Sequence, residues 1–147
     1  MRLLFIAFLS VLTLNATGFW TLTGVTKANI YVNNSADYLK PKTIIEIKKK
    51  MQSMLHQHGI QTQQQDSPTL MLSIEEIVED DTHYVYLKLA LGEEVKTFRK
   101  GGVETFALSY AASDFIDTDV SDLDEEVLGS VDFLLESFAE QFEDDKD

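Results

Sequence analysis

The sequence predicts an α+β fold, a two-layer sandwich in which an antiparallel sheet of about four strands carries two helices on one face. Residues 69–110 alternate apolar and polar side chains with a period of two, which is typical of strands with one buried face. Apolar residues recur at spacings of three and four over 41–58 and again over 123–142, which is typical of amphipathic helices. With a short strand before the first helix, the expected element order is β-α-β-β-β-α.

Length and composition limit the kinds of fold, partner and site that the chain can have. The chain has 147 residues, the size of one domain, and 44% of them are hydrophobic, which is enough for a core. Its formal net charge of -13 excludes nucleic acid as a partner. It has no cysteine, which excludes disulfides, thiolate metal sites and the lipid-modified cysteine of bacterial lipoproteins.

The N-terminus predicts export. Arg2 precedes an apolar run over 3–14, and the small residues Ala16 and Gly18 follow. This pattern is typical of a secretory signal peptide over 1–18, with cleavage near Gly18 and Phe19. The apolar run is short for crossing the hydrocarbon core of a bilayer, which is about 30 Å thick. An uncleaved membrane anchor is the alternative. The absence of cysteine from an exported domain favours a periplasmic over a secreted location. We expect a single domain over 19–142 and an acidic tail over 143–147.

The first strand and helix follow from local signals. Residues 28–32 form a short β-compatible run that ends in the turn formers Asn33 and Asn34. Pro41 suits the first turn of a helix, and Gly59 suits its C-terminal end.

In the central block, residues 70–74, 83–91 and 103–110 are expected to be strands. Gly92 interrupts the second alternating run, which predicts a bulge or bend in one long strand from 84 to 99.

The predicted strand over 83–91 places Tyr84, Tyr86 and Lys88 on the face opposite its aliphatic side chains. If the helices cover the aliphatic face, this second face is open and becomes a candidate partner-binding surface. Packing between neighbouring strands is the alternative explanation of the tyrosines. Arg99, near the predicted hairpin tip, is a further candidate partner contact.

The C-terminal quarter carries nearly all the negative charge. Residues 114–147 contain 14 acidic residues and a single base, Lys146. Ser121 to Asp124 resembles a capping sequence for the second helix, with Glu136 and Glu140 on its polar side. These acids predict either a surface for a basic partner or a solvated helix face.

Motifs for chemistry are weak. Within an acidic loop expected over 114–126, the residues Asp117, Asp119 and Asp122 are candidate calcium ligands, but the spacing does not fit an EF-hand. His83 is expected at the surface of a strand start. No nucleophile, phosphate-binding or zinc-protease motif is present, so we predict neither an enzyme nor a cofactor.

The layout resembles a known class. A strand over 28–32, a helix ending in His58-Gly59-Ile60 and a strand that opens at Ser67-Pro68-Thr69 are similar to small α/β subunits of Gram-negative outer-membrane machines. The lipoprotein plug of the lipopolysaccharide export channel is one example. The likeness covers most of 19–142 and implies an assembly role in the envelope. The absent lipobox cysteine departs from those lipoproteins, and no functional residue carries over.

These observations together predict an exported, periplasmic, non-catalytic binding or assembly module with an envelope protein as its partner. The alternatives are a calcium or small-ligand binder that uses the 114–126 segment and, third, a hydrolase with dispersed catalytic residues. Peripheral membrane association and the oligomeric state are left open.

Overall fold

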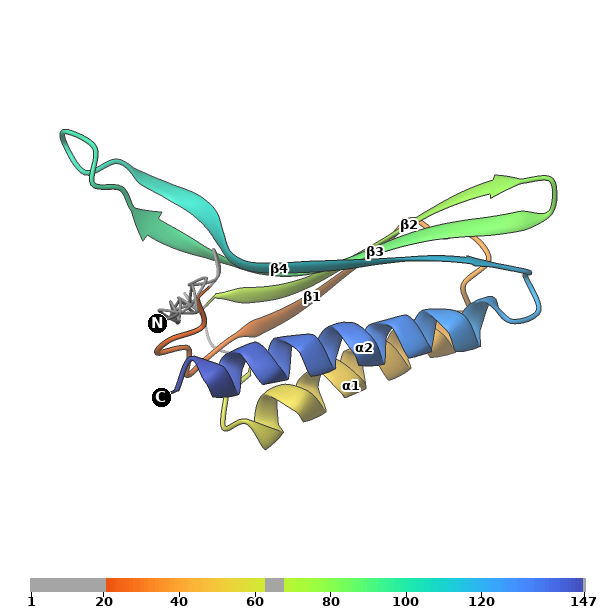
Figure 1. Cartoon of the computed structure of the whole chain (residues 1–147), viewed down its shortest axis with the longest axis horizontal. Coiled ribbons are helices and arrows are strands. Elements are labelled where there is room, and N and C mark those ends of the chain that lie inside the picture. The colour runs from red at the N-terminus through yellow and green to blue at the C-terminus, as the bar shows by residue number, and fades with distance from the viewer. Residues whose placement is uncertain (1–20, 63–67, 147) are drawn as a thin grey trace, which may run out of the picture.

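The computed structural model describes residues 21–62 and 68–146, so the expected signal peptide over 1–18 lies outside the described residues. The elements, in chain order, are β1 (Asn29–Asn34), α1 (Pro41–Gln57), β2 (Thr69–Glu79), β3 (Thr82–Lys96), β4 (Glu104–Thr118) and α2 (Leu123–Asp144). This is the predicted order β-α-β-β-β-α, and Figure 1 shows both helices lying side by side beneath one sheet.

The four strands follow one another across the sheet in the order β1-β2-β3-β4. The prediction of an antiparallel sheet was wrong for one pair, because β1 runs parallel to β2, with Asn29 opposite Thr69. Since α1 carries the chain back along the sheet before β2 begins, β2 starts at the same end as β1. The pairs β2–β3 and β3–β4 are antiparallel hairpins, as expected.

The core lies between the sheet and the helices. On β3 the aliphatic face is buried as predicted, with Leu87 and Leu89 at most 1% exposed. From the helix layer, Leu134 and Phe138 are completely buried. Within the described residues, neither helix combines the length and hydrophobicity that crossing a bilayer requires.

Local signals set the limits of α1. Pro41 occupies the first turn, where its missing N–H costs nothing. Gly59, just beyond the helix, has a φ of 75°, a conformation that favours glycine.

The irregularity predicted at Gly92 is confirmed, although the extra residue lies on the partner strand β4 and not on the long strand β3. The pairing of β3 with β4 shifts between Leu91 and Gly92, and Ser109 is the extra residue on β4. Beyond this bulge, β3 and β4 continue as a two-stranded arm that projects from the sheet (Figure 1).

The acidic segment over 114–126 is not a loop, contrary to our expectation. Its first part belongs to β4, where Asp114 lies opposite Leu87 and Phe115 opposite Tyr86. Asp114 points towards the helices, and its carboxylate accepts hydrogen bonds from Ser130 Oγ at 2.7 Å and from the Phe115 N–H. An inward-pointing charge on an edge strand also hinders pairing with foreign strands.

The C-terminal end is more ordered than a tail that starts at residue 143 would be. Helix α2 continues to Asp144, and the carboxylate of Asp145 accepts a hydrogen bond from the Leu22 N–H at 2.6 Å. The C-cap residue of α2 therefore helps hold the start of the described chain.

Candidate functional site

The face of the sheet turned away from both helices is the strongest candidate site. Register places Tyr86 beside Phe115 on this face, and in the next row Tyr84 lies between Ile77 and Asp117. The rings of Tyr84 and Phe115 stack with centroids 6.2 Å apart. Neither helix covers these side chains, because both helices lie on the other side (Figure 1).

Large apolar side chains remain exposed on this face. Phe115 is 61% exposed, Ile77 70% and Tyr86 38%. A cluster of this kind on one face is more informative than scattered apolar residues, since contiguous apolar patches on soluble domains often mark binding surfaces. We call the surface formed by Ile77, Tyr84, Tyr86, Lys88 and Phe115 the open face.

Lys88 supplies the positive charge of the open face. It lies in a polar row between Ser73 on β2 and Ser113 on β4. The next row holds the small side chains of Ala90 and Ala111, and Tyr31 of β1, 55% exposed, lies at the edge of the same row.

The structure brings together only some of the predicted partner contacts. Tyr84, Tyr86 and Lys88 share the open face, whereas Arg99 lies at the tip of the β3–β4 arm. Glu136 and Glu140 are exposed on α2, in the layer behind the sheet. These residues cannot all belong to one contact surface.

Sequence reasoning missed Phe115 and Ile77. Both continue the period of two of their strands, at positions in phase with the tyrosine face once the strands are paired. Phe115 was overlooked because the acids around it favoured a loop, and that alternation was the signal that could have identified it.

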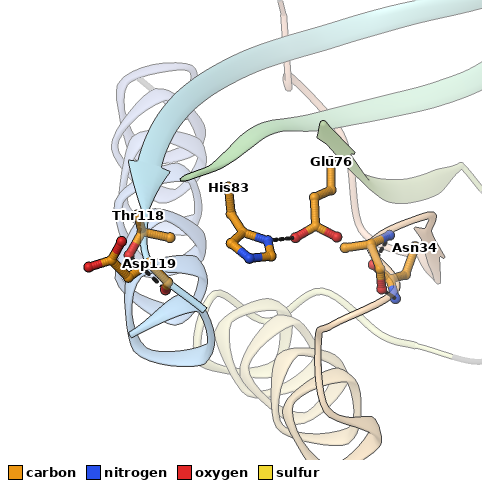
Figure 2. Close-up of polar contacts among 6 residues, drawn as sticks. Asn34, Glu76, His83, Thr118 and Asp119 are labelled. Carbon is orange, nitrogen blue, oxygen red and sulfur yellow. Dashed lines mark hydrogen bonds and ion pairs between the residues drawn. The ribbon is translucent and has the colours of Figure 1, made fainter. Parts of the chain in front are cut away.

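A second feature is a buried polar pair near the turn that joins β2 to β3 (Figure 2). Nδ1 of His83 lies 2.5 Å from Oε1 of Glu76, and the side chains are only 5% and 3% exposed. The Tyr38 ring packs edge-on against His83, with centroids 5.0 Å apart. The prediction of a surface His83 was wrong, because residue 83 shares the phase of Val85 and so points under the sheet.

This pair does not form an accessible catalytic site. A general base must reach a substrate proton within hydrogen-bonding distance, and these atoms are enclosed by Tyr38 and the neighbouring strands. Its buried, hydrogen-bonded arrangement fits a role in positioning the end of the sheet.

Asp124 joins the two helices at their N-terminal ends. Its carboxylate contacts Lys40 Nζ and Thr43 Oγ1, each at 2.5 Å, and it is 18% exposed. Burial raises the pKa of Asp124, but the hydrogen bonds from Lys40 and Thr43 outweigh burial and lower the pKa below its usual value. The expected Ser121–Asp124 cap is wrong in detail, since Asp122 is the N-cap residue and makes no side-chain cap bond.

The candidate calcium ligands do not share one loop. Asp117 belongs to β4 and lies opposite Tyr84, whereas Asp119 follows the strand and Asp122 directly precedes α2. Among the described residues, no three His, Asp or Glu side chains are grouped so that they could hold a metal ion.

A groove of about 390 Å³ lies between the two helices. Lys50 and Asp132 in this groove form an ion pair at 2.9 Å, and His58 contacts Glu143 at 2.5 Å, whereas Glu136 is in no ion pair among the described residues. The two pairs tie α1 to α2.

Comparison with known proteins adds no identity, since no family model matches the chain and no curated protein matches it significantly.

Proposed function

We propose that the protein is an exported, non-catalytic binding module of the cell envelope that holds another protein against its open face. The observation that carries this proposal is the cluster of exposed Tyr86, Phe115 and Ile77 on a sheet face that the helices leave bare. Export and the periplasmic location rest on the N-terminal pattern of Arg2, the apolar run and the small residues before Phe19.

The dimensions of the open face suit the centre of a protein contact. It spans three strands, about 14 Å, and five residues of β3, about 17 Å, which gives roughly 240 Å². A standard protein interface buries about 800 Å² on each partner, so a bound protein would also cover residues around the open face.

The chemistry of the face also suits protein recognition. Tyrosine offers a large rigid contact area with a polar end, and such residues are enriched among the side chains that dominate binding energy. Lys88, beside the aromatic rows, would favour a partner segment that carries a carboxylate.

Site-specific photo-crosslinking tests the proposal. A crosslinking amino acid is placed at Tyr86 or Phe115, and in matched variants at Glu136 or Glu140 on the helix layer. We expect one reproducible envelope protein from positions 86 and 115, and loss of that product when Ile77→Ser is added. Crosslinks that arise only from 136 and 140 would contradict the proposal and assign binding to α2.

A further inference from the structure

The sheet extends past the helix layer at both ends, and the two ends differ in charge. At one end the β3–β4 arm projects beyond β2, which pairs with β3 only as far as Gly92. At the other end, β2 and β3 join through the turn at Asp80 and Asp81 (Figure 1).

The tip of the β3–β4 arm is basic and apolar. Phe98 is completely exposed and Val103 is 51% exposed. Arg99 and Lys100 are exposed between them, and neither takes part in an ion pair among the described residues. A bare phenylalanine beside two free cations, at the end of a projecting arm, is typical of an interaction element. We call residues 97–103 the basic tip.

The opposite end of the sheet, at the β2–β3 turn, is acidic and also has exposed apolar side chains beside it. The acidic tip consists of Glu79, Asp80 and Asp81, and all three are exposed. On the strand leading to it, Ile77 is 70% exposed and Val78 46%. Each end therefore pairs exposed apolar side chains with charge, and the charges have opposite sign.

We propose that the basic tip of one molecule binds the acidic tip of a second copy of this chain, so that molecules associate head to tail. The two tips cannot meet within one molecule, because the 15 residues of β3 separate them by about 50 Å. The net charge of -13 opposes association of two copies, but the Debye length at physiological salt is about 8 Å, so charges farther than that from the joined tips are largely screened.

The geometry determines the kind of assembly. Because the contact joins two different surfaces, it does not close a symmetric dimer and leaves one free tip at each end. The contact is smaller than a standard interface, so we expect it to be weak and concentration-dependent. An anionic lipid surface could also attract the basic tip, but the acidic α2 and acidic tip of the same molecule would oppose close approach.

Two neutralised variants separate the two halves of the contact. Arg99→Ser/Lys100→Ser removes the cations of the basic tip. Glu79→Gln/Asp80→Asn/Asp81→Gly removes the acidic tip, and Asn-Gly suits the two-residue turn in which Asp80 and Asp81 have φ values of 49° and 65°. The second variant is therefore expected to fold without added strain.

Sedimentation velocity of the purified protein gives the readout. We expect the sedimentation coefficient of the wild type to rise with concentration at about 0.05 M salt and to stay at the monomer value at about 0.5 M. Each variant alone should remain monomeric. An equimolar mixture should form a one-to-one dimer and nothing larger, since only one intact tip of each kind remains.

Lys48→Ser/Lys49→Ser, in the middle of α1, is the matched control, with the same change of charge as Arg99→Ser/Lys100→Ser, and should associate like the wild type. A wild type that stays monomeric, or a control that loses association equally, would overturn the proposal. So would binding to phosphatidylglycerol vesicles that depends on Arg99 and Lys100 without self-association, which would assign the basic tip to lipid.

Discussion

Glu76 and His83 face each other across the β2–β3 hairpin, and their 2.5 Å contact lies almost entirely out of solvent. Removing one member leaves the other buried without its partner, whereas removing both leaves mainly a loss of packing. We expect Glu76→Ala and His83→Ala each to lower the free energy of unfolding by about 3 kcal/mol. The double variant should lose clearly less than the sum of the two.

Urea unfolding of the wild type, the two single variants and the double variant gives this double-mutant cycle. Strictly additive losses would show that the pair is not coupled and that the side chains contribute only through packing.

Asp124 predicts an acid-dependent loss of stability. Its folded pKa lies below the usual value of 3.8, so its contribution is present above about pH 4 and is lost as pH falls through the folded pKa. Asp124→Asn should cost about 1 kcal/mol at neutral pH, because Lys40 is largely exposed and the ion pair is screened. Stability measured from neutral pH down past about pH 4 should fall less steeply in this variant than in the wild type. Parallel curves would contradict the assignment.

Gly92 is expected to resist substitution by alanine. A Cβ at this position would overlap the ring of Phe106 and lie 2.8 Å from Cε of Met71. Because the obstructing atoms belong to side chains that can move, Gly92→Ala should cost about 1–2 kcal/mol in unfolding free energy. Adding Phe106→Ala should recover most of this loss, and a double variant as unstable as the single one would assign the loss to the remaining contact with Cε of Met71.

Tyr110 should ionise at unusually high pH. It is 4% exposed and packs edge-on against Phe138 at 5.1 Å between centroids. Burial raises its pKa to about 12, because the phenolate would lose its hydration. Since the folded pKa is raised, its contribution to stability is complete below about pH 10 and is lost as pH rises towards 12.

Ultraviolet titration of tyrosinate should show one group ionising after the others, and Tyr110→Phe should remove that last step. A late step that persists in this variant would assign the raised pKa to another tyrosine.

The sequence alone determined which elements form and which of their faces are buried. The alternation around Leu87 and the three-and-four spacing around Phe138 are local patterns, so they specify a strand and a helix without reference to the rest of the chain. The same local reasoning placed Tyr84, Tyr86 and Lys88 together.

Only the tertiary structure decided how these elements align. The parallel pairing of β1 with β2, the strand conformation of Phe115 and the burial of Glu76 against His83 all depend on neighbours distant in sequence. Pairing with β3 supplies hydrogen bonds that outweigh the preference of an acidic segment for a loop. For the same reason the open face became visible only when three strands, each contributing a few side chains, were placed side by side.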